Sequence, residues 1–255
     1  MCQREYYNIV KATGIQPAEK TGMAAALACG ISAAILPGYH EAILPLGVSF
    51  LMTWLLLFKK KLASIPEMSS TLMGIIYFGY LPSFWIRLRF SFDAMRATLF
   101  PSVPLLSQGT GAMVLWWTWC SIVCSDVGAY FSGMAFGKTK LSEVCAAAGA
   151  ASPNKTVEGF VGGALFCTAF FSLGARYMLW PRWCFWGPVY GAMLSFLGLV
   201  GDLTVSMMKR DASVKDTGNI LPGHGGLLDR IDSYMLSGPL CYFLIQKLLF
   251  PMGGN

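Results

Sequence analysis

Long runs without charge constrain the fold of this chain more than any other feature. Six stretches contain no Asp, Glu, Lys or Arg: residues 21–40, 42–58, 68–86, 159–175, 183–201 and 233–246. A seventh apolar stretch, 109–137, is interrupted by Asp126 alone. A helix crosses the roughly 30 Å hydrocarbon core of a bilayer with about 20 apolar residues. We therefore predict an all-α, polytopic integral membrane protein with about seven transmembrane helices, or about six to eight depending on the Pro-containing segment 100–106.

The composition argues against a soluble protein. The chain is 55% hydrophobic and 13% charged, which is unusual for a soluble domain, and the many uncharged runs disfavour the alternative of one large buried helical core. Residues 1–20 include Glu5 and Glu19 and no apolar segment, so they read as neither a secretory signal nor a transit peptide. The eight Cys form no C-x-x-C pair, so we expect neither a zinc site nor a disulfide framework.

The distribution of Lys and Arg predicts which loops share a membrane face. With seven spans, 13 of the 19 basic residues fall on one side, and such an excess is typical of the cytoplasmic side. The count places residues 152–160 and 206–235 at the same face, where we expect a polar active-site cavity. Because the positive charge lies between spans, the net charge of +6 indicates no nucleic-acid partner and favours contact with the lipid bilayer.

A cluster of ionisable residues follows the uncharged run 183–201. Asp202 lies at the end of that run, and an ionisable group near hydrocarbon is a functional candidate because its burial is costly. On a helix, Ser206, Lys209 and Arg210 fall on the same stripe as Asp202. An alternative role for Lys209 and Arg210 is to anchor the helix to anionic lipid.

Two further carboxylates complete a candidate metal site. Asp229 and Asp232 would share one face of a helix that begins near Leu227 and continues into the last span. Hard divalent cations such as Mg²⁺ prefer carboxylate oxygens, often together with substrate phosphates. Asp202, Asp229 and Asp232 are therefore our candidate ligands for Mg²⁺.

A Gly-rich segment and a second polar loop suggest phosphate binding. Gly223, Gly225 and Gly226 surround His224, and glycines let the backbone approach an anion closely. The alternative for His224 is a satisfied polar residue without a ligand.

The loop "SPNKTVEG" offers a cation at Lys155 and a hydroxyl at Thr156, followed by Glu158 at the mouth of a span. Its alternative role is a helix entry with Thr156 as the N-cap. Asp126 lies inside a span, where a carboxylate usually faces a polar cavity.

Three segments together resemble a known family. The pattern S-x-x-K-R-x(4)-K-D-x-G-x(3)-P-G-H-G-G-x-x-D-R-x-D, from Ser206 to Asp232, resembles the hallmark of phosphatidate cytidylyltransferases, the CDP-diacylglycerol synthases. "SPNKTVEG" is similar to the family motif S-P-K-K-T-x-E-G, with Asn154 in place of the first Lys. "SDVGAYFSGMAFGKT", 125–139, is similar to a third family segment, S-D-x-x-A-Y-x-x-G-x-x-x-G-K.

The resemblance implies an Mg²⁺-dependent nucleotidyltransferase of phospholipid biosynthesis. It would join CTP and phosphatidate to give CDP-diacylglycerol and pyrophosphate, with K⁺ as a candidate second cation. The implied catalytic residues are Asp202, Lys209, Arg210, Lys215, Asp216, His224, Asp229, Arg230 and Asp232. The implied substrate-binding residues are Asp126, Ser152, Lys155, Thr156, Glu158, Gly159, Ser206, Gly223, Gly225 and Gly226.

The same resemblance bears on regions and location. Residues 71–89 are similar to the plastid and cyanobacterial branch of the family, so we predict a plastid membrane, with a bacterial inner membrane as the alternative. We divide the chain into an N-terminal membrane region, 1–108, with about three spans, and a C-terminal catalytic region, 109–255. A homodimer is left open.

Two rival functions are compatible with a membrane fold rich in polar loops. A CTP-dependent lipid kinase, acting on a polyprenol or phytol, would release CDP and a phosphorylated lipid. A transporter would use Asp126 and the charged loop as an ion path, although the chain shows no clear inverted repeat.

Overall fold

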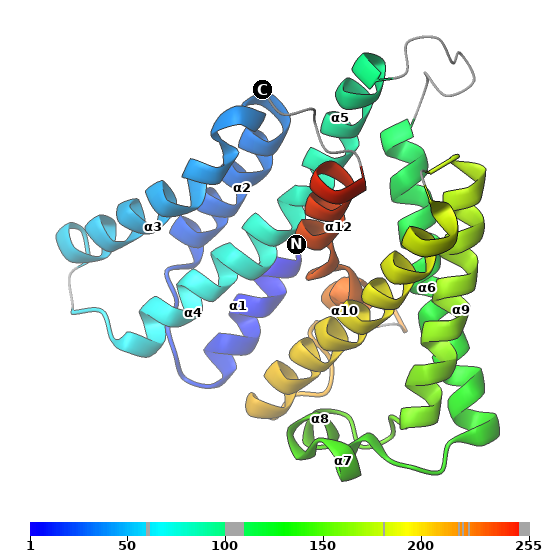
Figure 1. The fold of residues 1–255 in the computed structure, drawn as a ribbon. Coiled ribbons are helices and arrows are strands. Elements are labelled where there is room, and N and C mark those ends of the chain that lie inside the picture. Colours follow the sequence, from blue (N-terminus) through cyan, green and yellow to red (C-terminus); the bar gives the residue numbers. More distant parts are fainter. Residues whose placement is uncertain are drawn as a thin grey trace. The chain divides into compact units, whose positions relative to one another are not determined.

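The computed structural model describes residues 1–59, 62–99, 110–180, 182–218, 220, 222–223 and 225–249. Its elements are all helical (Figure 1), in agreement with the predicted all-α class. In chain order they are α1 (Cys2–Ala12), α2 (Glu19–Ile35), η1 (Pro37–Tyr39), α3 (His40–Leu57), α4 (Ile65–Ile75), η2 (Ile76–Tyr80), α5 (Leu81–Leu99), α6 (Thr110–Phe136), α7 (Leu141–Val144), α8 (Ala146–Ala151), α9 (Val157–Tyr177), α10 (Trp183–Asp211), α11 (Leu228–Ile231), η4 (Asp232–Tyr234), α12 (Ser237–Phe243) and η5 (Leu244–Leu249).

Four helical segments among the described residues are long and apolar enough to cross a membrane. They are Pro37–Leu57, Gly111–Phe136, Val157–Tyr177 and Trp183–Asp211. Each overlaps one of the seven predicted spans, so the chain is an all-α membrane protein, and the predicted total of about seven stays a prediction. The Pro-containing segment 100–106, which left that total open, lies outside the described residues.

The chain forms two compact units that do not follow chain order. The first unit joins Met1–Arg87 to Met208–Ile231, and the second joins Leu88–Met207 to Asp232–Asn255. The charged loop after α10 therefore packs with N-terminal residues, which differs from our division of the chain at residue 108. The catalytic role assigned to residues 109–255 stays a prediction.

In the first unit, α2, α3 and α4 pack against one another around an apolar core (Figure 1). Leu51, Leu55 and Ile75 are buried at its centre. Helix α1 adds Tyr7, whose ring is fully buried. A Cβ on Gly22 or Gly74 would lie 1.9 Å or 2.4 Å from the Tyr7 hydroxyl, so these glycines provide the space for the ring.

Local sequence signals define the start of α4. Ser64 and Glu67 form a capping box, in which the Ser64 side chain accepts a hydrogen bond from the Glu67 N–H and the Glu67 carboxylate accepts one from the Ser64 N–H. Pro66 fits the first turn because its missing N–H would have no partner there. The helix continues through the π-helical turn η2 into α5.

In the second unit, α6 and α9 pack closely along a seam of small residues (Figure 1). A Cβ on Gly163 would lie 2.5 Å from the Ser125 carbonyl oxygen, and one on Gly162 would lie 2.0 Å from the Ser132 hydroxyl. Small residues allow this approach, which is typical of helix pairs in membranes. Further along, the rings of Phe171 and Tyr190 stack at a centroid distance of 4.2 Å and link α9 to α10.

The prediction of one helix running from near Leu227 into the last span is wrong. Helix α11 ends at Ile231, η4 follows, and α12 begins only at Ser237. The Asp232 carboxylate accepts a hydrogen bond from the Ser233 N–H at 2.8 Å, which is a local alternative to continued α-helical bonding.

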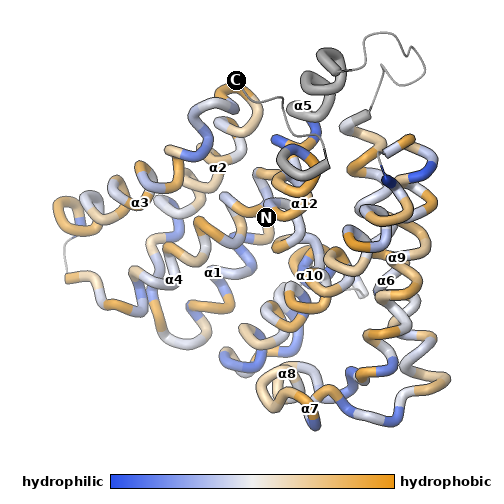
Figure 2. The backbone as a smooth tube through the Cα atoms, viewed as in Figure 1, coloured by the Kyte–Doolittle hydropathy of each residue, from blue (hydrophilic) through white to orange (hydrophobic). Residues whose placement is uncertain are grey.

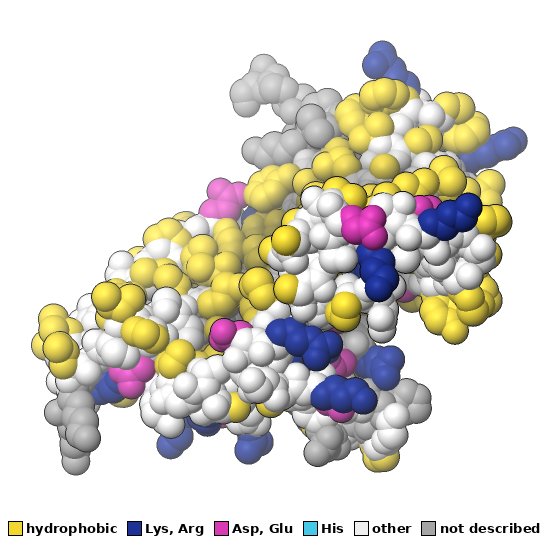
Figure 3. All heavy atoms as spheres, turned by 90° about the horizontal axis from the view of Figure 1, so that it is seen from below, with side chains coloured by type: hydrophobic (Ala, Val, Ile, Leu, Met, Phe, Trp, Pro, Cys, Tyr) yellow, Lys and Arg dark blue, Asp and Glu magenta, His cyan; other side chains and the backbone are white. Residues whose placement is uncertain are grey.

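Hydrophobic residues dominate the long helices and much of the exposed surface. Along α6 and α9 the tube in Figure 2 shows many orange segments, which mark hydrophobic residues, between paler ones of intermediate hydropathy. Exposed side chains on these helices include Trp116, Phe131, Leu165 and Phe166. The face in Figure 3 likewise carries many yellow hydrophobic side chains among its charged ones. An exposed apolar surface of this extent is expected where lipid is the solvent.

Candidate active site

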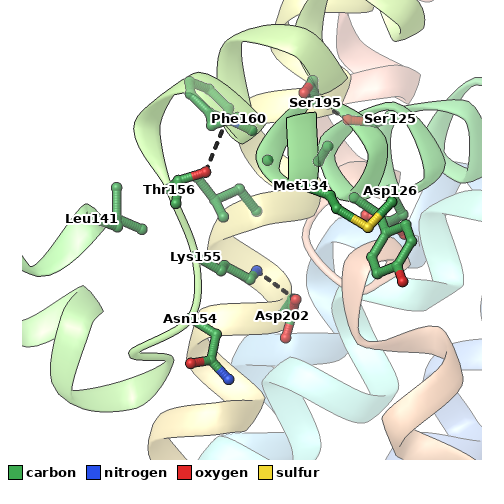
Figure 4. A pocket seen from close by; sticks show the side chains of 15 residues that line it. Ser125, Asp126, Met134, Leu141, Asn154, Lys155, Thr156, Phe160, Ser195 and Asp202 are labelled. Atoms are coloured by element: carbon green, nitrogen blue, oxygen red, sulfur yellow. Dashed lines mark hydrogen bonds and ion pairs between the residues drawn. The ribbon is translucent and has the colours of Figure 1, made fainter. Parts of the chain in front are cut away.

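A cavity of about 500 Å³ lies in the second unit, among α6, α9, α10 and the loop before α9 (Figure 4). Its lining residues are Ser125, Asp126, Ala129, Tyr130, Gly133, Met134, Leu141, Asn154, Lys155, Thr156, Gly159, Phe160, Ser195, Leu199 and Asp202. Five residues that the sequence singled out therefore meet in one cavity: Asp126, Lys155, Thr156, Gly159 and Asp202.

An ion pair crosses the cavity from the loop to α10. The Lys155 Nζ lies 2.5 Å from an Asp202 carboxylate oxygen (Figure 4). The other Asp202 oxygen accepts a hydrogen bond from the Ser206 hydroxyl at 3.2 Å, one helical turn further along. The predicted stripe of Asp202 and Ser206 on one helix face is confirmed by this contact.

A second carboxylate enters the same cavity from α6. Asp126 lines the cavity on the α6 side. Next to it, the buried hydroxyls of Ser125 and Ser195 form a hydrogen bond of 2.7 Å that ties α6 to α10. The cavity therefore contains two carboxylates and one cation, with hydroxyl groups beside them.

The loop before α9 owes its shape to capping interactions. The Thr156 side chain caps α9 by accepting a hydrogen bond from the Gly159 N–H at 3.1 Å. Glu158 accepts hydrogen bonds from the backbone N–H groups of Lys138 and Thr139, at 3.2 Å and 3.1 Å. Glu158 thus fastens the end of α6 to the start of α9, and Ser152 lies at the C-terminal end of α8.

A second charged cluster lies in the first unit, around Asp229. One Asp229 oxygen accepts a hydrogen bond from the Lys209 Nζ at 2.7 Å. The other accepts from the Thr217 N–H and hydroxyl, both at 2.9 Å, and from the Gly226 N–H at 3.1 Å. Asp229 therefore joins the end of α10 to the loop that leads into α11.

These bonds favour the ionised form of Asp229. Burial alone would raise its pKa, but the hydrogen bonds from Lys209 and Thr217 outweigh burial and lower the pKa below its usual value. Asp229 is consequently ionised at neutral pH.

The Gly-rich segment has the backbone geometry that glycine permits. Gly223 and Gly225 have φ values of +74° and +78°, in the left-handed region. A Cβ on Gly226 would lie 2.0 Å from the Thr217 hydroxyl. The predicted role of these glycines, which is to let the backbone approach a bound phosphate, stays a prediction. His224 lies outside the described residues.

The remaining predicted residues divide between exposed and buried positions. In the first unit, the side chains of Arg210, Lys215, Asp216 and Arg230 are exposed. In the second unit, Asp232 is buried. Within the described parts of the chain, no group of three or more His, Cys, Asp or Glu is arranged to hold a metal ion. The three-carboxylate metal site stays a prediction, since Asp202 and Asp229 belong to different units.

Two residues of the charged cluster were missed by the sequence reasoning. Thr217 lies inside the Ser206–Asp232 pattern, at a variable position next to Asp216. Its place among the pattern residues is the one sequence feature that could have drawn attention to it. Glu5 accepts hydrogen bonds from the backbone of Leu227 and Leu228, although more than 200 residues separate them along the chain. No local pattern marks Glu5.

Comparison with known proteins agrees with the sequence resemblance. A model of the cytidylyltransferase family matches residues 1–248. Phosphatidate cytidylyltransferase of Synechocystis sp. is 41% identical over 259 residues, which cover 96% of this chain and 85% of the relative.

Two other relatives match over shorter ranges. Chloroplastic phosphatidate cytidylyltransferase 4 of Arabidopsis thaliana is 36% identical over 79% of this chain and 51% of its own length. Phosphatidate cytidylyltransferase of Bacillus subtilis is 46% identical over 49% of this chain and 45% of its own length. The matched region is therefore about half of each of these two relatives.

Proposed function

Because the chain belongs to the cytidylyltransferase family, we propose that it transfers the cytidylyl group of CTP to phosphatidate. The products are CDP-diacylglycerol and pyrophosphate. The observation that carries this proposal is the cavity in which Lys155, Asp202 and Asp126 meet. The cavity belongs to a bundle whose long helices are apolar enough to cross a membrane, so a lipid substrate could react without leaving the bilayer.

The reaction brings two anions together. An oxygen of the phosphatidate phosphate attacks the α-phosphorus of CTP, the new P–O bond forms, and the bond between the α-phosphorus and the bridging oxygen of pyrophosphate breaks. Such a step needs positioning and charge neutralisation rather than a protein nucleophile. Lys155 supplies a positive charge inside the cavity, and the N-terminus of the long helix α9 adds a favourable dipole beside it.

The donor set of the cavity fits a hard divalent cation. Asp126 and Asp202 both line it, and carboxylate oxygens are the ligands that Mg²⁺ prefers. We propose that Asp202 and Asp126 hold Mg²⁺, which when bound would neutralise phosphate charge. The assignment of Asp229 and Asp232 as metal ligands remains a hypothesis from the sequence, and K⁺ as a second cation remains one from the family resemblance.

The charged cluster of the first unit would contribute further cations. Lys209 is held by Asp229 at 2.7 Å, and Lys215 and Arg230 are exposed near the same segment. We propose that these side chains, together with Arg210, neutralise phosphate charge in the reaction. The relatives from a cyanobacterium and from chloroplasts favour a plastid membrane as the location.

The test is a product assay with the purified protein in detergent. Incubation with CTP, phosphatidate and Mg²⁺ should yield CDP-diacylglycerol and pyrophosphate in equal amounts, and EDTA should abolish both until Mg²⁺ is restored. In a parallel incubation with a polyprenol in place of phosphatidate, CDP together with a phosphorylated polyprenol would identify a lipid kinase instead. A folded protein that binds CTP but forms neither product would refute the proposal.

A further inference from the structure

Glu5 is a buried carboxylate with an unusual set of partners. Its side chain is only 3% exposed. One oxygen accepts a hydrogen bond from the Leu227 N–H at 2.9 Å, and the other accepts from the Leu228 N–H at 2.7 Å and from the Thr217 hydroxyl at 3.3 Å. A carboxylate is well suited to this arrangement because all of its hydrogen-bonding sites are acceptors.

The loop backbone passes directly over this carboxylate. A Cβ on Gly218 would lie 2.9 Å from one Glu5 oxygen, and a Cβ on Gly226 would lie 2.9 Å from the other. Glycine is therefore required at both positions if the loop is to approach Glu5 this closely. These contacts with Glu5 fall at two places in the chain between α10 and α11, at 217–218 and at 226–228.

The same segment is held on its other side by Asp229. The Thr217 hydroxyl lies 2.9 Å from Asp229 and 3.3 Å from Glu5, so it sits between the two carboxylates. Asp229 in turn holds Lys209. Glu5 thus acts on the charged cluster through the loop backbone, without touching the basic side chains that we assign to phosphate.

Helix α1 is itself fixed independently of the loop. The Gln3 side-chain amide donates hydrogen bonds to the carbonyl oxygens of Gly22 and Gly74, at 3.0 Å and 3.1 Å. The Tyr7 hydroxyl donates to the Thr71 carbonyl oxygen at 3.2 Å. Glu5 is therefore presented to the loop from a helix that α2 and α4 hold in place.

We propose that Glu5 is a positioning residue that sets the backbone conformation at 217–218 and 226–228. The inference rests on the proposed function, in which Lys209 and Lys215 meet the substrate phosphates. By fixing the loop before substrate arrives, Glu5 would remove part of the ordering cost of CTP binding. Second-sphere groups of this kind affect substrate affinity and turnover without contacting the substrate.

The variant Glu5→Gln tests the proposal with little change in size. Its side chain has one acceptor oxygen, so an NH₂ group would face one of the two backbone N–H donors. We expect the KM for CTP to rise about 10- to 100-fold. We also expect faster hydrogen exchange in the peptide that covers 216–231. The matched control is Glu19→Gln, because Glu19 pairs with Lys11 outside this loop; it should leave both measurements unchanged.

The two readouts separate positioning from simple stabilisation. If Glu5 only stabilised the fold, Glu5→Gln would lower Tm and the fraction of active protein. The folded molecules would then keep the wild-type KM and the wild-type hydrogen exchange of the loop. This result would overturn the proposal. If Glu5→Gln does not fold, the same two measurements on Glu5→Asp decide, with a raised KM and faster exchange expected.

A failure of the proposed function would be seen separately. Wild-type protein without CDP-diacylglycerol synthesis would refute the function, and hydrogen exchange of the loop would still decide whether Glu5 fixes its conformation.

Discussion

At the scale of single residues, the ion pair between Lys155 and Asp202 contributes little to stability, and we propose that it serves substrate binding. The two side chains are 28% and 31% exposed, and a pair with this much solvent contact contributes at most about 1 kcal/mol. The pair lies in a cavity beside Asp126. In the proposed reaction, a substrate phosphate would replace the Asp202 carboxylate as the partner of Lys155.

Replacing Lys155 by Met should reduce kcat/KM for CTP by about 100-fold or more, since a charge that stabilises the transition state is lost. The melting temperature in detergent should change little. Steady-state kinetics and thermal unfolding measure both effects. Lys140→Met is the matched control, because Lys140 is an exposed cation of the same loop region. Equal losses in the two variants would argue against a role of Lys155 in the cavity.

At the scale of helices, the close packing of α6 against α9 determines the shape of the cavity. Asp126 and Gly133 come from α6, and Gly159 and Phe160 come from α9. Gly163 lies on the same seam, opposite the Ser125 carbonyl oxygen. Any residue that separates the two helices would therefore displace the groups that line the cavity.

The substitution Gly163→Ala should destabilise the protein by about 1–3 kcal/mol, because its Cβ meets backbone that cannot move without shifting a helix. Thermal unfolding in detergent should show a clear decrease in Tm, with a parallel loss of activity. Gly198→Ala in α10 is the control, since its Cβ would have no neighbour closer than 3.8 Å. A Tm for Gly163→Ala equal to that of the control would contradict the packing argument.

At the scale of the whole molecule, the apolar helices and their exposed hydrophobic side chains place the chain in a membrane. Four helical segments among the described residues are candidate spans, and the plastid membrane that we propose as the location is a prediction to be tested. The predicted topology puts the segments 152–160 and 206–235 on one face of that membrane.

An epitope-tagged form expressed in photosynthetic plant cells should co-fractionate with plastid membranes. It should stay in the pellet after washing with alkaline carbonate, because integral helices resist extraction that removes peripheral proteins. Immunoblots of the fractions measure both properties. Release of the protein into the carbonate supernatant would rule out integral insertion, and enrichment in another membrane would refute the plastid assignment alone.

The sequence alone determined the helical membrane class and the protein family. Uncharged runs predict spanning helices because a bilayer leaves backbone groups no partner outside the helix. The stripe of Asp202 and Ser206 and the N-cap of Thr156 are local features with fixed helical spacing, so they could be predicted. The predicted helix from Leu227 is interrupted between Ile231 and Ser237, where the Asp232 carboxylate accepts a hydrogen bond from the Ser233 N–H, a local contact that periodicity does not predict.

Only the tertiary structure decided which polar groups meet. The cavity joins α6, a loop and α10, and the Gly-rich segment joins Asp229 to Glu5 from the first helix of the chain. Spacing along a helix predicts neighbours within about four residues, whereas packing brings together groups at any separation. Glu5 could not be found from sequence for this reason: its partners are backbone N–H groups, which every residue except proline carries.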